Sequence, residues 1–289
     1  MTGIVVGVDG SEGAARALVW AAREARLRQW SVTAVMAWGW LADYHAIVGD
    51  QAETGDLKAI AVDALDAYVE DALGPGTAGS LGRRVVNDVA TRALLDASLD
   101  AELLVVGARG LGGVRGLLLG SVSQQCLHHA SCPVAVVRAD VATTSGPAGR
   151  VVVGVDGSDA ATQALRWAAE EARVRGAVLE VVHAWYRPYL GGYPHVGSAF
   201  DPVVLEQAAR SVLKAAVASV RAAGPEQPVE GVLAYGDASS EIVERSEGAD
   251  LVVVASRGLG GFAGLLLGSV SAHVSRHAGR PVVVVRRSA

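Results

Sequence analysis

Three glycines and a serine stand at a spacing that suits phosphate binding: Gly107, Gly110, Gly120 and Ser121, in the pattern Gly-x2-Gly-x9-Gly-Ser. Glycines let the backbone curl and approach a ligand closely. Gly120-Ser121 opens a predicted helix, whose first N–H groups are unpaired and whose dipole is positive at that end. Ser121 and Ser123 add hydroxyls. The pattern therefore predicts a phosphate cradle built from backbone donors.

The same pattern occurs twice in the 289 residues. The segment Leu103–Ser123 returns as Leu251–Ser271, and the first motif glycine becomes Ala255. Val5–Ser11 returns as Val152–Ser158, which places an aspartate, Asp9 or Asp156, at the end of the first predicted strand of each half. A period of half the chain indicates domain duplication. We expect domains at residues 1–138 and 150–289, joined by a small, polar linker at 139–149. The second cradle then contains Ala255, Gly258, Gly268, Ser269 and Ser271.

Each half alternates strand and helix patterns. Short Val-rich runs between amphipathic segments are typical of a parallel sheet that is covered on both faces. We expect an α/β fold with two tandem doubly wound parallel five-stranded sheets. In such sheets ligands bind at the carboxyl ends of the strands, where the winding direction reverses. The predicted strands and helices of the first half are Ile4–Asp9, a helix from Ser11 to about Gln29, Val32–Trp38, a helix over Leu57–Leu73, Arg83–Val86, a short helix through Leu99, Leu103–Gly107, a helix from Ser121, and Val134–Val137.

Composition excludes several classes of protein. Hydrophobic residues make up 51% and charged residues 19%, a globular profile and not a disordered one. The net charge of -5 argues against a nucleic-acid partner, because gripping a phosphate backbone usually needs a basic surplus. The sequence contains no stretch of 18 uncharged apolar residues, so it predicts no membrane span. The N-terminus lacks the basic start of a secretory signal, and two cysteines make no disulfide framework, so we expect a cytoplasmic protein.

These residues resemble the universal stress protein family, in its ATP-binding branch and in the tandem form found in actinobacteria such as mycobacteria. The resemblance implies ATP as the ligand of each half, with or without Mg²⁺. It places Asp9 and Asp156 against the adenosine, and the backbones of Ala37 and Ala184 against adenine. It assigns the ribose and phosphates to the loop glycines and serines: Gly107, Gly110, Gly120 and Ser121, then Gly258, Gly268 and Ser269. Ala255 departs from the pattern, and a positive φ there would weaken the second site.

The resemblance further implies a nucleotide-dependent stress regulator or sensor with one site per domain. Slow ATP hydrolysis or phosphotransfer remains an alternative, although the sequence offers no recognisable base or metal-ligand set. A flavin or nicotinamide carrier on the same fold is another, since fold alone does not fix function. We expect the halves to pack as an internal pseudo-dimer through Val134–Val137 and Val282–Val285, and two chains to form a homodimer.

Two features suggest other chemistry. Gly258, Gly260 and Ala263 match a dinucleotide-binding pattern, but they follow the fourth predicted strand of their half instead of the first. Cys126, His128, His129 and Cys132 are spaced like zinc ligands, but the repeat keeps only one of them, as His277. We therefore interpret the cysteines as free, buried or half-buried thiols.

Overall fold

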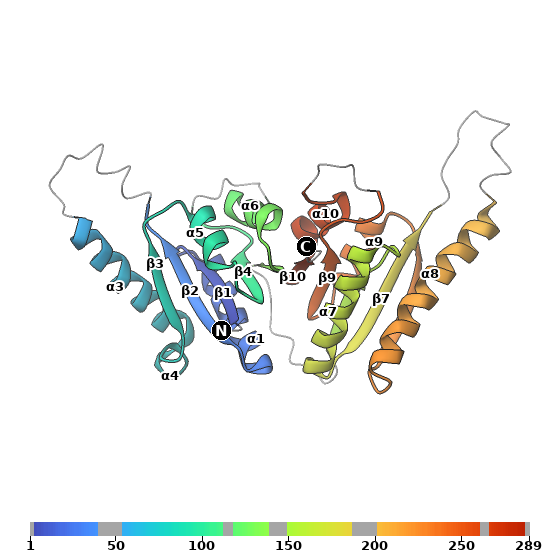
Figure 1. Cartoon of the computed structure of the whole chain (residues 1–289), viewed down its shortest axis with the longest axis horizontal. Helices are drawn as coiled ribbons and strands as arrows, with labels where there is room; N and C mark the ends of the chain where they lie inside the picture. The colour runs from blue at the N-terminus through green and yellow to red at the C-terminus, as the bar shows by residue number, and fades with distance from the viewer. Residues whose placement is uncertain are drawn as a thin grey trace, which may run out of the picture. The chain divides into compact units, whose positions relative to one another are not determined.

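The computed structural model describes residues 3–39, 54–111, 118–138, 149–186, 201–260 and 266–286. It divides into two compact units between residues 141 and 142 (Figure 1). In each unit five strands form a sheet, with the order β3-β2-β1-β4-β5 in the first and β8-β7-β6-β9-β10 in the second. The strand pairs within each unit are parallel, and this confirms the predicted doubly wound fold.

The first unit contains ten described elements: β1 (Gly3–Val8), α1 (Glu12–Arg28), β2 (Ser31–Ala37), α3 (Thr54–Leu73), α4 (Pro75–Ala78), β3 (Gly82–Val86), α5 (Ala90–Ala97), β4 (Leu103–Gly107), α6 (Ser121–His129) and β5 (Val134–Val137). The second unit contains nine: β6 (Arg150–Gly154), α7 (Asp159–Arg175), β7 (Val178–Trp185), α8 (Pro202–Ala223), β8 (Val229–Tyr235), α9 (Ala238–Ser246), β9 (Leu251–Ala255), α10 (Ser269–His277) and β10 (Val282–Val285).

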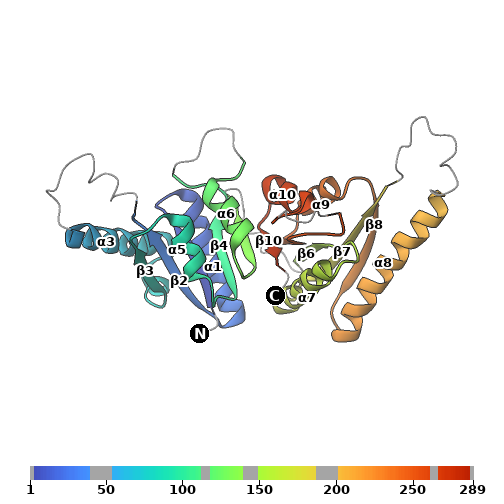
Figure 2. The same cartoon turned by 45° about the horizontal axis from the view of Figure 1, so that its top comes forward.

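Helices cover both faces of each sheet. In the first unit α1 packs beside α3, and α5 packs beside α6; in the second the pairs are α7 with α8 and α9 with α10 (Figure 2). The central strands are buried because their valines and leucines meet helices on both sides. None of the described helices is both long and apolar enough to cross a membrane.

Serines start the first helix of each unit, as the sequence predicts for α1. Ser11 Oγ accepts a hydrogen bond from the Ala14 N–H at 3.2 Å, and Ser158 Oγ accepts one from Ala161 N–H at 3.1 Å. The predicted elements are present with ends that shift by a few residues. The first strand ends at Val8 instead of Asp9, because the Asp9 side chain accepts the Ser11 N–H and starts a turn there. Helix α5 ends at Ala97 instead of Leu99, and α3 begins at Thr54 instead of Leu57.

Candidate functional site

Each unit has a cavity where the winding direction of its sheet reverses. β1 and β4 are neighbours, and Val6 lies opposite Val105, so the same register places Asp9 level with Ala108 just after β4. The cavity there has a volume of about 380 Å³, and the equivalent cavity of the second unit about 410 Å³. Both volumes are typical of small-molecule sites.

All the residues that the sequence analysis assigned to the ligand line these two cavities. The first cavity is lined by Asp9, Ala37, Gly107, Gly110, Gly120, Ser121 and Ser123 among others. The second is lined by Asp156, Ala184, Ala255, Gly258, Gly268, Ser269 and Ser271 among others.

The aspartates connect the first strand of each unit to its glycine loop. Asp9 Oδ1 accepts the Ser11 N–H at 3.0 Å, while Oδ2 accepts the Leu111 N–H at 3.0 Å. Asp156 repeats both bonds, with Ser158 at 2.9 Å and Leu259 at 2.7 Å. Each aspartate is thus a turn former and also holds the loop at the edge of the cavity.

Gly110 and Gly258 are required by these carboxylates. A Cβ on Gly110 would collide with Asp9 Oδ2, and a Cβ on Gly258 would collide with Asp156 Oδ2. A contact within the protein therefore accounts for the second glycine of the motif, which lets the carboxylate reach the loop backbone.

No comparable contact within the protein requires glycine at Gly120 and Gly268. A Cβ on Gly120 would meet its nearest neighbour, the Ala108 carbonyl oxygen, at 3.5 Å, which is an ordinary contact. Gly120 has φ −76° and ψ 160°, and Gly268 has φ −77° and ψ 161°, angles that any residue adopts. Both are N-cap residues, and neither α6 nor α10 has a side-chain cap. Each helix therefore presents uncapped N–H groups at the cavity.

Ser123 and Ser271 hold the loop through hydrogen bonds from their hydroxyl groups to backbone carbonyls. Ser123 is buried, and its Oγ donates to the Gly107 carbonyl at 2.7 Å. Ser271 Oγ lies 3.0 Å from the Ser256 carbonyl and 3.0 Å from the Gly268 carbonyl. Ser121 and Ser269, the first residues of their helices, are exposed and line the cavities.

Ala255 fits the second site without backbone strain. Among the described residues Gln29 is the one non-glycine residue with positive φ. Ala255 therefore has a negative φ, and the backbone strain that a positive φ would cause is absent. In the first unit the situation differs, because a Cβ on Gly107 would approach the Gly13 carbonyl carbon and oxygen at 2.8 Å. The repeat of the second unit has Ala160 at the position of Gly13, so both members of this contact change together.

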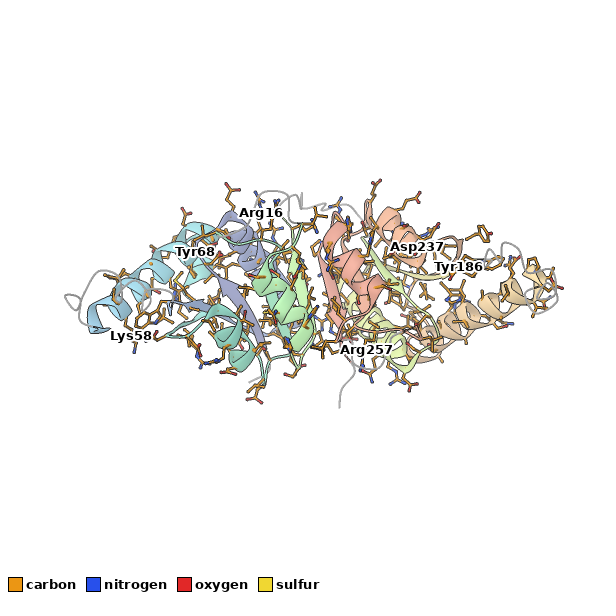
Figure 3. All side chains as sticks on the ribbon, turned by 90° about the horizontal axis from the view of Figure 1, so that it is seen from above. Arg16, Lys58, Tyr68, Tyr186, Asp237 and Arg257 are labelled. Carbon is orange, nitrogen blue, oxygen red and sulfur yellow. The ribbon has the colours of Figure 1, made fainter. Side chains whose placement is uncertain are left out.

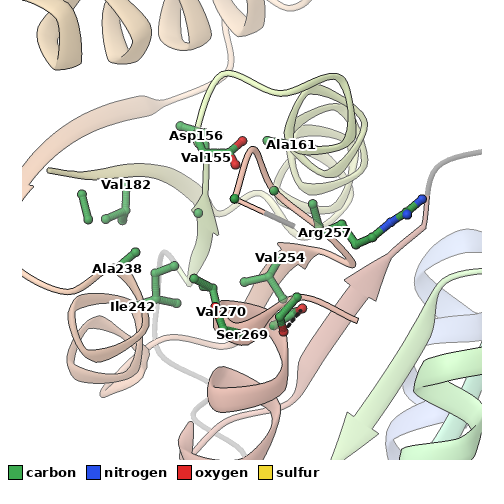
Figure 4. Close-up of a pocket in the computed structure, with 17 residues that line it drawn as sticks. Val155, Asp156, Ala161, Val182, Ala238, Ile242, Val254, Arg257, Ser269 and Val270 are labelled. Atoms are coloured by element: carbon green, nitrogen blue, oxygen red, sulfur yellow. Dashed lines mark hydrogen bonds between the residues drawn. The ribbon is translucent and has the colours of Figure 1, made fainter. Parts of the chain in front are cut away.

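The second cavity has an apolar end and a polar end. Figure 4 shows Val182, Ala238 and Ile242 at one end and Arg257 at the other, with Asp156 and Ser269 on opposite sides. The first cavity has the matching Val35, Ala90, Leu94 and Arg109. The sequence analysis did not assign the apolar residues to the site, because buried apolar residues in a strand or helix resemble ordinary core positions.

The two cysteines are free and buried, as the sequence interpretation has them. Burial, and to a smaller extent the neighbouring Cys132, raises the pKa of the Cys126 thiol to about 12. Within the described ranges no group of three or more His, Cys, Asp or Glu side chains is placed to hold a metal ion.

Comparisons with a family model, with relatives and with a solved structure agree with one another. The model of the universal stress protein family matches residues 1–138 and 148–286. A universal stress protein of Mycolicibacterium smegmatis is 36% identical over 98% of this chain and 97% of its own length. One from Mycobacterium tuberculosis is 36% identical over 99% and 97%. A crystal structure of a universal stress protein from Archaeoglobus fulgidus has a TM-score of 0.69 at 21% identity, over 99% of this chain and 98% of that one, which supports the fold.

Proposed function

The chain belongs to the universal stress protein family, and we propose that each of its domains binds one adenine nucleotide, ATP, so that the protein acts as a nucleotide-dependent stress regulator or sensor. One observation carries this proposal. In both units an uncapped helix N-terminus, preceded by a glycine that no internal contact requires, faces a cavity at the reversal of the sheet.

The two ends of the cavity fit the two ends of a nucleotide. The apolar end, at Ala37 and Leu94 in the first unit, suits a flat base, whose edge can bond to the backbone of Ala37. The polar end suits phosphates, because the N–H groups at the start of α6 and the exposed Ser121 hydroxyl are donors. Arg109, which also lines the cavity, adds a positive charge.

Asp9 and Ser123 act as positioning residues in this proposal. The Asp9 carboxylate holds the loop through the Leu111 N–H, and Ser123 holds the start of α6 against the end of β4. The same division applies to Asp156 and Ser271 in the second unit.

Mg²⁺ has no fitted set of protein ligands among the described residues. The one carboxylate that lines each cavity already accepts two backbone N–H groups. We therefore propose that any Mg²⁺ arrives on the ATP phosphates, and we assign no protein residue to it.

Calorimetry on the full chain tests the two sites separately. Wild-type protein should bind two ATP molecules. Gly120→Glu puts a negative side chain where the phosphates would lie, so it should leave one site, in the second domain; Gly268→Glu should leave the one in the first. Each lost charged hydrogen bond weakens binding by about 1.5–3 kcal/mol, or roughly tenfold or more.

The double variant should stay folded by circular dichroism and bind no nucleotide. Wild-type stoichiometry in the folded double variant would show that ATP binds elsewhere, and no binding to the wild type at millimolar ATP would refute the function. We further propose a homodimer in the cytoplasm, and light scattering during size-exclusion chromatography tests the dimer.

A further inference from the structure

The second domain has another cavity, between α7 and α8, with a volume of about 430 Å³. It adjoins the nucleotide cavity, because Val155 and Ala161 line both. The apolar part of its wall includes Leu165 and Val212, and the exposed side chains of Ser211 and Ser219 lie at its open side.

The first domain shows what fits this place. The buried positions of α3, Ala61, Leu65 and Val69, correspond to Ala209, Leu213 and Val217 of α8, a constant offset. The same offset aligns Tyr68 with Ala216, which lines the cavity.

Tyr68 reaches across from α3 to the turn before α1 (Figure 3). Its hydroxyl donates to the Ser11 carbonyl at 2.5 Å. Burial, followed by the charges of Asp9 and Asp71, raises the pKa of Tyr68, so the phenol stays protonated and remains a donor. The first domain thus holds a phenol ring between its two helices, and the second domain holds an alanine methyl group at that position.

The polar groups of the cavity are suited to a ligand that donates a proton. The Ser158 carbonyl, which corresponds to the Ser11 carbonyl, accepts from Thr162 Oγ1 at 3.1 Å. Ser211 Oγ donates to the Gln207 carbonyl at 2.9 Å, and Ser219 Oγ donates to the Ala216 carbonyl at 2.7 Å. Thr162, Ser211 and Ser219 all line the cavity, and their hydroxyl protons are already used. What remains for a ligand is oxygen lone pairs.

We propose that this cavity binds a small phenolic molecule, whose ring occupies the space that Tyr68 fills in the first domain and whose hydroxyl donates to Thr162 Oγ1. The ring packs on Leu165 and Val212, and the site is separate from the nucleotide site although the two share wall residues. Its occupancy requires no ATP.

The probe is p-cresol, which is the tyrosine side chain with a hydrogen atom in place of the backbone, so that Cβ becomes a methyl group. Titration of the full chain, followed by NMR signals of the probe, should show one saturable site. Ala216→Tyr supplies the ring from the chain itself and should weaken p-cresol binding at least tenfold, while ATP stoichiometry remains as in the wild type. Tyr68→Ala is the matched variant and should add a second p-cresol site, in the first domain.

Thr162→Val provides a test that does not change the volume of the cavity. It should weaken p-cresol several-fold and leave the affinity for toluene, which lacks the hydroxyl, unchanged. Absence of saturable p-cresol binding to the wild type would overturn the proposal. Undiminished binding to folded Ala216→Tyr would also overturn it, and so would equal loss of p-cresol and toluene in Thr162→Val.

Discussion

Asp9 and Leu111 are 102 residues apart in the chain and are joined by a hydrogen bond of 3.0 Å from the Leu111 N–H to Asp9 Oδ2. This bond closes one side of the first cavity, because Asp9 follows β1 and Leu111 lies in the loop after β4. Asp156 and Leu259 repeat it at 2.7 Å. Both sites therefore share one device that fixes the glycine loop before any ligand arrives.

Replacing Asp9 by alanine should release this loop in the first domain. Two backbone hydrogen bonds are lost, each worth about 0.5–1.5 kcal/mol, so ATP affinity of the first site should fall about fivefold or more. Calorimetry should show one tight site and one weak site per chain. Asp156→Ala is the matched control and should weaken the second site only. Equal affinities of both sites in either variant would contradict this role.

The first position of the motif should respond differently in the two domains. Gly107→Ala forces a methyl group to within 2.8 Å of Gly13 backbone atoms, and overpacking of this kind costs about 1–3 kcal/mol. Ala255→Gly creates no clash and should cost only about 0.4–1 kcal/mol, through the entropy of the unfolded chain. Urea unfolding followed by circular dichroism should give the lower midpoint for Gly107→Ala. ATP affinity of the second site should not decrease in Ala255→Gly, and a decrease would show that the alanine methyl group contacts the ligand.

Local signals in the sequence predicted the elements that carry the site. Runs such as Val151–Val153 and the cap residues Ser11 and Ser158 determine a strand and two helix starts through short-range physics. The glycine spacing located the loop, because its position after the fourth strand places it at the reversal of the sheet.

Contacts between distant segments could not be predicted in this way. The reason for Gly110 is the Asp9 carboxylate, which only the fold brings to it. Leu94 and Ile242 form the apolar ends of the cavities, yet their sequence pattern is that of core residues. Tyr68 fills the space between two helices of the first domain, whereas Ala216 lines a cavity in the second. This difference depends on which helix face meets α1 or α7, and the pattern of one helix does not specify its neighbour.

The cysteines should react slowly in the folded protein. The pKa of Cys126 is raised to about 12, first by burial, and burial also raises the pKa of Cys132. At pH 8 the folded Cys126 thiol is almost wholly protonated, whereas an unfolded cysteine, with a pKa of about 8.5, is partly thiolate. Alkylation by iodoacetamide at pH 8 should therefore be at least about a hundredfold slower in the native protein than in urea.

The same shift has a consequence for stability. Because the folded pKa lies above the unfolded one, the contribution of this thiol is complete below about pH 8.5 and is lost as pH rises towards 12. The free energy of unfolding should decrease over this range, and Cys126→Ser should reduce the decrease. Fast alkylation of the native wild type at pH 8 would contradict the burial of the thiols.

Gly120→Ser should change stability and ligand binding in opposite directions. The backbone at Gly120, φ −76° and ψ 160°, closely matches that at Ser11, φ −81° and ψ 156°, where the serine caps its helix. A serine at 120 can cap α6 in the same way, through the Ser123 N–H, and should stabilise the ligand-free protein by a few tenths of a kcal/mol. Because its side chain then occupies the helix N-terminus, ATP affinity of the first site should fall about tenfold, the loss expected from one charged hydrogen bond. Thermal unfolding without nucleotide and calorimetry with ATP measure the two effects on one sample.

Gly268→Ser, with nearly the same backbone angles, should act equally on the second site and serves as its matched control. If Gly120→Ser is more stable and still binds two ATP molecules with wild-type affinity, the phosphates do not lie at the start of α6.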